Sequence, residues 1–147
     1  MNKMTQAYTT ICNELEKDLS MRLERTLILK EQNAIRNAGS LMMLEVFERN
    51  FEGCQTTKEI EEQFLELYKM DRLDIAIEQL SNSYIKHKPK LDPIIESIRT
   101  CGNCLDVIKI MDYFKEYEQS NRFTKLIAAR KLNVKLKLKL EELKERD

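Results

Sequence analysis

Hydrophobic side chains recur every three or four positions along most of the chain, the spacing that places them on one side of a helix. The first such stripe consists of Met4, Tyr8, Ile11, Leu15 and Leu19. Residues 105 to 117 carry apolar side chains over more than half of a helix circumference, so we expect a well-enclosed helix there. The pattern therefore predicts a helical protein.

Short polar segments separate these stripes and contain residues that end or begin helices. Gly39 can adopt the left-handed conformation that ends a helix, and Ser40 can cap the helix that follows. Thr56 and Glu59 have the spacing of a capping box. We therefore expect one long helix that bends or ends near residues 37–40, followed by shorter helices.

Two further boundaries are expected in the second half of the chain. Residues 81–93 contain both prolines and predict the longest loop, with Asp92 as a helix cap and Pro93 at the first helical position. A later helix should end near Gly102, with Asn103 as the next cap and Asp106 at its third position.

Composition supports the same fold class. The chain has only 3 glycines and 2 prolines in 147 residues, and Leu, Glu, Lys, Ile and Met are abundant. Those residues lose little side-chain freedom in a helix. We predict an all-α fold in which residues 1–147 form a single domain, a bundle of about six or seven helices with a long amphipathic C-terminal helix.

The segment Lys131–Leu140 alternates polar and apolar residues, which is the period of a strand. As a strand it would need a partner for its backbone groups, and no other segment alternates clearly. Leu and Lys both favour the helical conformation. A helix is therefore favoured, and an intermolecular strand remains as the alternative.

As a helix, this segment has apolar residues on two opposite sides at about 100° per residue. One stripe contains Ala129, Leu132, Leu136, Leu140 and Leu143, and the other contains Phe123, Ile127, Val134 and Leu138. A helix on the surface of a bundle buries only one side. Either it is central, or one side meets another molecule. The predicted partner-binding residues are Leu132, Lys135, Leu136, Lys137, Lys139, Leu140 and Leu143.

The formal net charge is zero, so charge is informative only through its distribution along the chain. Residues 45–66 contain seven acidic and two basic side chains, whereas residues 121–140 contain seven basic side chains and no acidic one. Each segment can be an ordinary solvated surface. Alternatively, the acidic segment of one region or subunit can face the basic segment of another.

Candidate chemistry is sparse, and we predict that the protein is not an enzyme and needs no cofactor or metal. Cys101 and Cys104 form a single CxxC pair without the second pair of a zinc site, so they are expected to pack inward at a helix corner. His87 is the only histidine and lies in a Lys-rich stretch, where a solvated loop position is expected. No phosphate-binding loop or nucleophile motif occurs.

The N-terminal residues lack the apolar core of a secretory signal, and no apolar run approaches the roughly 18 residues of a membrane span. These features favour a cytoplasmic, intracellular protein. Its four cysteines are then expected to be thiols.

Three functional hypotheses remain. The first is a protein-binding module, such as a small adaptor or inhibitor of viral or mobile-element origin, that self-associates and acts through its C-terminal helix. The second is a nucleic-acid-associated regulator that uses the basic C-terminal segment on phosphates. The third is a helical subunit of a larger assembly such as a tethering complex. The stretch from Cys104 to Arg122 is similar in general character to helical membrane-tethering subunits, without a motif specific to them.

Overall fold

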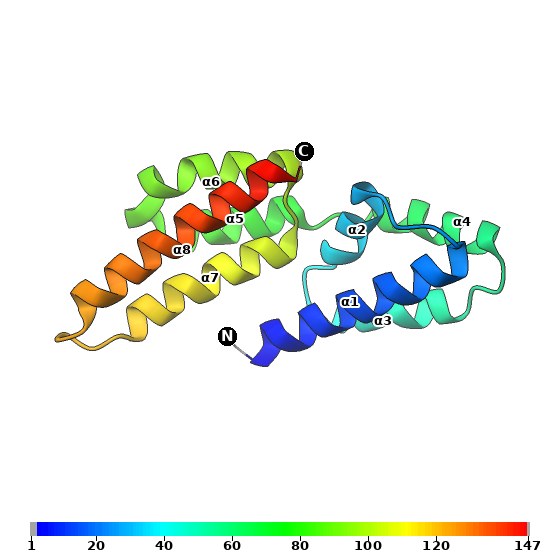
Figure 1. Ribbon diagram of the computed structural model, residues 1–147, viewed down its shortest axis with the longest axis horizontal. Helices are drawn as coiled ribbons and strands as arrows, with labels where there is room; N and C mark the ends of the chain where they lie inside the picture. The colour runs from blue at the N-terminus through cyan, green and yellow to red at the C-terminus, as the bar shows by residue number, and fades with distance from the viewer. Residues whose placement is uncertain (1–2, 147) are drawn as a thin grey trace. The chain divides into compact units, whose positions relative to one another are not determined.

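The computed structural model describes residues 3–146, and the all-α prediction is confirmed: within that range there are helices and no strands. The helices group into two compact units, one that extends to Asp74 and one that begins at Ile75 (Figure 1). The prediction of a single domain stays a prediction, and each unit is described by itself.

The first unit contains α1 (Lys3–Leu23), α2 (Leu29–Arg36), α3 (Leu41–Glu52) and α4 (Thr57–Tyr68). The helix α1 packs against the other three. Aromatic side chains fill much of the core between them, among them Tyr8, Phe47, Phe51 and Phe64. The rings of Phe51 and Phe64 lie 4.9 Å apart, so α3 and α4 are joined by direct aromatic packing.

The buried stripe of α1 differs from the predicted one. The side chains that α1 buries are Thr5, Tyr8, Cys12, Leu15 and Leu19. Met4 is 65% exposed and Ile11 is half-buried, so their assignment to the stripe was wrong. The Tyr8 hydroxyl donates to the carbonyl oxygen of Arg36 at 2.8 Å, which helps to fix how α1 is rotated about its axis. The smaller Thr5 and Cys12 therefore face the core.

The expected single long helix is divided into α1 and α2. Glu24 has a φ of 57°, a left-handed conformation that ends the helix, and an extended segment follows. Glu31 then pairs with Arg25 at 2.7 Å and accepts the backbone N–H of Ile28 at 3.0 Å. Burial alone would raise the pKa of Glu31, but its hydrogen bond with Arg25 outweighs burial and lowers it.

The predicted boundaries on both sides of α3 are confirmed. Gly39 has a φ of 86°, and the Ser40 side chain accepts the N–H of Met43 at 3.2 Å. At the start of α4, the Thr56 hydroxyl accepts the N–H of Glu59 at 3.1 Å. These contacts satisfy backbone groups that a helix start leaves without partners.

The second unit contains the short helix η1 (Ile85–His87) and three longer helices, α6 (Lys88–Cys101), α7 (Cys104–Gln119) and α8 (Lys125–Glu145). The helix α5 (Leu73–Ser83) spans the boundary between the units. In Figure 1, α8 runs beside α6 and α7, and it packs against both. Residues Lys131–Leu140 are helical throughout, so the helical alternative is confirmed and the strand alternative is wrong.

The predicted loop over residues 81–93 is also wrong. It is largely helical, and α6 begins five residues before Pro93, which lies inside the helix. Pro89, near the start of α6, takes the role expected for Pro93, because a helix start does not need the missing N–H. At the other end of α6 the prediction is confirmed: the helix ends at Cys101, and Asn103 caps α7 with Asp106 at its third position.

Candidate protein-binding surface on the C-terminal helix

The leucine stripe predicted to bind a partner is the inner side of α8. Leu132, Leu136 and Leu143 are buried, and Leu140 is half-buried. The helix contacts α6 and α7, the neighbours that cover this side. In this fold the four leucines stabilise the second unit, and a partner cannot reach the buried ones without opening that unit.

The three predicted lysines have different environments. Lys139 is buried and pairs with Asp106 at 2.6 Å, with both side chains 2% exposed. Lys135 pairs with Glu116 on α7 at 2.7 Å. Of the three, Lys137 alone is exposed and forms no ion pair with residues 3–146. This lysine can therefore meet a partner without breaking an existing ion pair.

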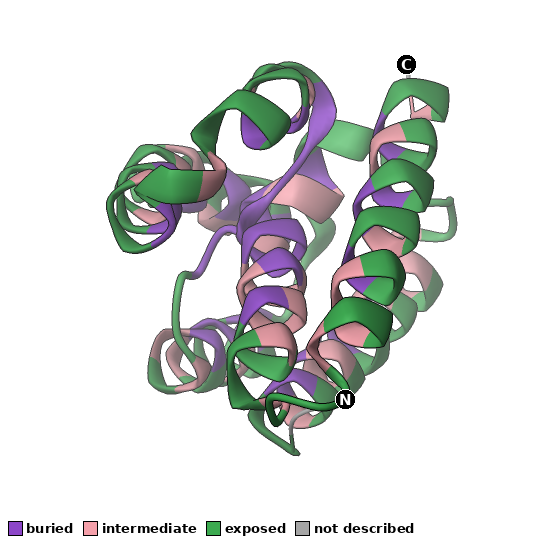
Figure 2. Ribbon diagram, turned by 90° about the vertical axis from the view of Figure 1, so that its left-hand side faces the viewer, coloured by how far each residue is buried: buried purple, intermediate pink, exposed green. Residues whose placement is uncertain are grey.

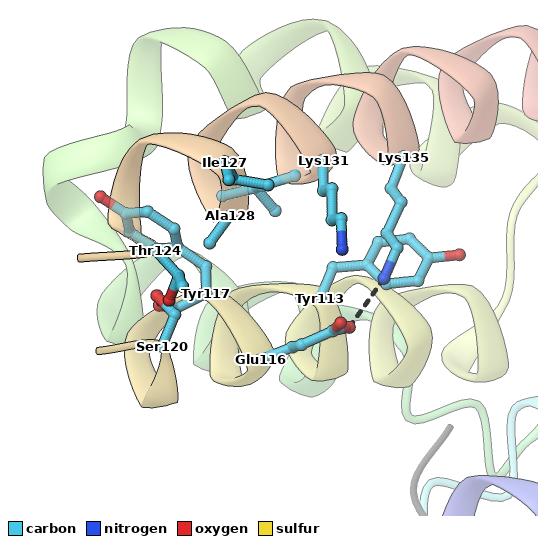
Figure 3. Close-up of a pocket in the computed structure, with 10 residues that line it drawn as sticks. Tyr113, Glu116, Tyr117, Ser120, Thr124, Ile127, Ala128, Lys131 and Lys135 are labelled. Carbon is cyan, nitrogen blue, oxygen red and sulfur yellow. Dashed lines mark hydrogen bonds and ion pairs between the residues drawn. The ribbon is translucent and has the colours of Figure 1, made fainter. Parts of the chain in front are cut away.

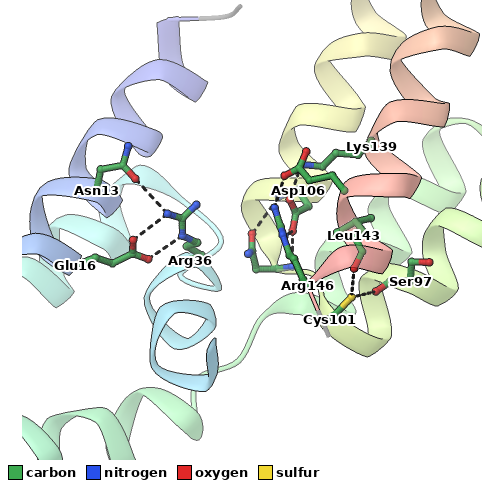
Figure 4. A network of polar contacts seen from close by, with 11 residues as sticks. Asn13, Glu16, Arg36, Ser97, Cys101, Asp106, Lys139, Leu143 and Arg146 are labelled. Carbon is green, nitrogen blue, oxygen red and sulfur yellow. Dashed lines mark hydrogen bonds and ion pairs between the residues drawn. The ribbon is translucent and has the colours of Figure 1, made fainter. Parts of the chain in front are cut away.

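Asp106 is the centre of a buried polar network between α7 and α8 (Figure 4). It accepts the backbone N–H of Asn103 at 2.9 Å and pairs with Arg146 at 2.5 Å as well as with Lys139. Burial alone would raise the pKa of Asp106, but Arg146 and Lys139 outweigh it and hold the pKa below its ordinary value. The network therefore keeps a charged carboxylate at the start of α7 and fastens the end of α8 to it.

The opposite side of α8 is exposed. Three large hydrophobic side chains lie there, Ile127 (54% exposed), Val134 (57%) and Leu138 (59%), and together with Phe123 (93%) in the turn before the helix we call them the α8 outer face. Figure 2 shows exposed residues along one side of α8 and buried residues along the other. Several exposed large apolar side chains on one side of a helix, rather than single scattered ones, are a feature of interaction sites.

Basic side chains border the outer face. Four of them, Arg122, Arg130, Lys131 and Lys137, are exposed and form no ion pair with any side chain of residues 3–146. Lys125 instead donates to the backbone carbonyl of Tyr117 at 2.9 Å. The outer face is therefore both apolar and positively charged.

A groove lies between α7 and α8 beside the outer face (Figure 3). We call it the α7–α8 groove; its volume is about 330 Å³, and it is lined by Tyr113, Glu116, Tyr117, Ser120, Thr124, Ile127, Ala128, Lys131, Leu132 and Lys135. The amine of Lys125 lies 4.3 Å from the ring centre of Tyr117, and that of Lys135 lies 5.3 Å from the ring centre of Tyr113. Each contact positions a tyrosine from α7 against a lysine from α8.

This groove was not predicted from the sequence, although one signal was present. Tyr113 and Tyr117 are four residues apart and therefore share a side of α7. Their partners on α8 depend on the rotation of that helix, which its two apolar stripes left undecided. Asp106 was recognised as a capping residue, but its pairing with Lys139 and Arg146 is a contact between distant segments.

His87 is not the solvated loop residue that was predicted. It is half-buried in η1, and its ring lies 5.0 Å from that of Phe114 and 5.8 Å from that of Tyr117. Its Nε2 atom is buried and has no hydrogen-bond partner among the residues that the structure describes. Burial, with a smaller contribution from Lys86 and Lys90, lowers the pKa of His87 and favours the neutral ring.

Cys101 and Cys104 are buried thiols at the corner between α6 and α7, as predicted. The Cys101 thiol donates to the carbonyl oxygen of Leu143, which ties this corner to α8. Within residues 3–146, no three His, Cys, Asp or Glu side chains are arranged to hold a metal ion.

No helix within the part of the chain that the structure describes is long and apolar enough to cross a membrane. No family model matches the chain, and no similar protein was found among curated proteins or solved structures. The resemblance of Cys104–Arg122 to tethering subunits stays a prediction.

Proposed function

We propose that this protein is a non-enzymatic protein-binding module whose contact surface is the α8 outer face. The observation that carries the proposal is the exposure of four large hydrophobic side chains along and just before a helix whose other side is already fixed in its own unit. Covering all four stabilises a complex by at most on the order of 6 kcal/mol before the cost of association. The proposed contact surface is thus the side of α8 opposite the leucine stripe that the sequence predicted.

A pair of adjacent substitutions tests the proposal. Val134→Glu places a charge on the outer face, whereas Asn133→Glu makes the same change about 100° around the helix. Tagged full-length protein would be used to capture partners from cells that naturally contain it. We expect proteins captured by the wild type and by Asn133→Glu to be lost with Val134→Glu. The same proteins on all three baits would contradict the proposal.

The proposal includes self-association, because a second copy can cover the same face. In an antiparallel pair of α8 helices, Ile127 lies opposite Val134 of the other copy, and Leu138 lies near the turn that precedes the other copy's α8. The same pairing brings Arg130 close to Lys131 of the other copy. We therefore expect association that strengthens with salt, measured by sedimentation at two protein and two salt concentrations. A monomer under all four conditions would remove this part of the proposal.

A second candidate function is nucleic-acid binding, favoured by the four exposed basic residues that form no ion pair within residues 3–146. Contacts with phosphates release counterions, so binding must weaken steeply as salt rises. Titration of duplex and single-stranded DNA and RNA across a salt series tests this candidate. The opposite salt dependence separates it from self-association, and an absent or flat response would exclude it.

A further inference from the structure

We propose that the α7–α8 groove binds an acidic amphipathic helix of a partner protein, with apolar side chains in the groove and a carboxylate against Lys131. This inference rests on the proposed function and specifies the partner's chemistry. The groove is then a second contact surface next to the α8 outer face.

The shape of the site favours a helix as the occupant. The groove follows the space between two adjacent helices, and a third helix can pack into such a space with side chains spaced three and four residues apart. Its walls are the half-buried Tyr113 and Tyr117 on one side and Ile127 and Ala128 on the other. These walls are largely apolar, so they suit aliphatic or aromatic side chains of a partner.

The groove opens onto a larger apolar surface. Ile127 belongs both to the groove and to the α8 outer face. On the helical wheel, Val134 and Leu138 lie on the same side of α8 as Ile127. An occupant that fills the groove therefore extends onto the outer face, which fits a helix of several turns better than a small molecule.

Charge selects an acidic occupant. The only carboxylate that lines the groove within the described residues is that of Glu116, and Lys135 neutralises it at 2.7 Å. Lys131 also lines the groove and acts on Glu116 through its charge, but it forms no ion pair with any side chain of residues 3–146. Its side chain extends towards the space between the helices in Figure 3. A carboxylate of a partner helix can form an ion pair with Lys131.

The same features disfavour two other occupants. A second copy brings its own basic residues to the surface, so like charges meet. Single-stranded nucleic acid needs open aromatic faces for stacking, but Lys125 and Lys135 each occupy one ring face of Tyr117 and Tyr113. An acidic amphipathic helix, by contrast, offers apolar side chains to the groove walls and a carboxylate to Lys131.

The test uses the full chain and three labelled synthetic peptides of about 18 residues, long enough for several helical turns. The first has a stripe of leucines flanked by glutamates, the second replaces the glutamates with lysines, and the third redistributes the leucines of the first. At about 0.15 M salt, where distant charges are screened, fluorescence anisotropy should show binding of the first peptide. The second and third should bind at least about tenfold more weakly.

Two lysines of α8 provide a matched pair of variants. Lys131→Glu reverses a charge in the groove, and Lys137→Glu makes the same change on an exposed residue about 120° away around the helix. We expect Lys131→Glu to weaken binding of the first peptide about tenfold, Lys131→Arg to retain it, and Lys137→Glu to change it less than about twofold. Circular dichroism verifies that each variant is folded, and Lys131→Ala repeats the test with a smaller change.

The outcomes separate this inference from the proposed function. Peptide binding that is lost with Val134→Glu and unchanged with Lys131→Glu would overturn the groove inference and leave the outer-face proposal standing. Equal binding of the acidic and basic peptides, or no binding of either, would overturn it as well. If Lys131→Glu disrupts self-association or nucleic-acid binding and leaves peptide binding intact, the occupant is a second copy or a nucleic acid, and the inference is wrong.

Discussion

The helices α1 and α8 have the same length of 21 residues, yet they use their surfaces differently. On α1, the exposed large hydrophobic residues, Met4 and Met21, lie near its two ends, and the middle of its outer side is polar. On α8, exposed apolar residues continue from Leu126 to Leu138. Packing within its own unit buries one apolar side of each helix. The second apolar side of α8 stays exposed and can contact another molecule.

The two helices also differ in how ion pairs hold them. Glu16 of α1 pairs with Arg36 at 2.8 Å in a partly exposed position, whereas Lys139 of α8 pairs with Asp106 in the interior. A buried charge that loses its partner is far more costly than a hydrated one. This contrast gives the largest expected effect of mutation.

We expect Asp106→Ala to lower the free energy of unfolding by about 3–5 kcal/mol, because the buried Lys139 keeps only the exposed Glu142 at 3.5 Å and Arg146 also loses its buried partner. Glu16→Ala should cost about 1–2 kcal/mol, because water can reach Arg36. Urea denaturation of both variants provides the measurement. Equal losses would show that burial does not distinguish the two pairs.

The inner sides of the two helices should behave alike. Leu19 on α1 and Leu143 on α8 are both fully buried, so replacing either with alanine should cost about 2–5 kcal/mol through lost burial and a cavity. Leu126→Ala, on the exposed side of α8, serves as the control and should change stability by less than about 0.5 kcal/mol. A small effect of Leu143→Ala would mean that α8 packs loosely against α6 and α7.

His87 is the chain's only histidine and lies in the same unit as α8. The free energy of unfolding of that unit should therefore change with pH near neutrality. The pKa of His87 is lowered in the folded protein by burial and by Lys86 and Lys90, against an opposing effect of Glu118. The unfolded chain therefore binds a proton at His87 more readily than the folded chain does. The contribution of His87 to the free energy of unfolding is fully present above about pH 6.5 and is lost as the pH falls through the folded pKa. Urea midpoints measured from about pH 7.5 to pH 5 should fall for the wild type.

The variant His87→Phe isolates this contribution. It keeps an aromatic ring against Phe114 and Tyr117 and removes the titrating group. Over the same pH range its midpoint should change less than that of the wild type. Identical slopes would show that His87 does not contribute to the pH dependence.

The smallest effect on stability is expected on the outer face itself. Val134→Ser combined with Leu138→Ser should change the free energy of unfolding by no more than about 0.5 kcal/mol, because both side chains are more than half exposed. Binding of a dye that fluoresces on apolar surfaces should nevertheless decrease. A large loss of stability would show that these residues support the fold, and the contrast with α1 would then disappear.

The helical class and several helix boundaries could be predicted from the amino-acid sequence. Ser40, Thr56 and Asn103 cap helices as predicted, because a cap acts on backbone groups only two or three residues away. Lys131–Leu140 is helical despite its alternation, in agreement with the intrinsic preference of Leu and Lys. Local chemistry was sufficient for these features.

Which side of each helix is buried depends on how the helices pack against one another. The sequence marked both stripes of α8 as apolar, and the leucine stripe became the inner side because α6 and α7 cover it. Likewise, Thr5 and Cys12 replaced Met4 and Ile11 in the core once α1 had packed against its neighbours. Periodicity fixes the angles between side chains on a helix, whereas the direction in which the helix faces depends on distant segments. The α8 outer face and the α7–α8 groove follow from that second kind of information.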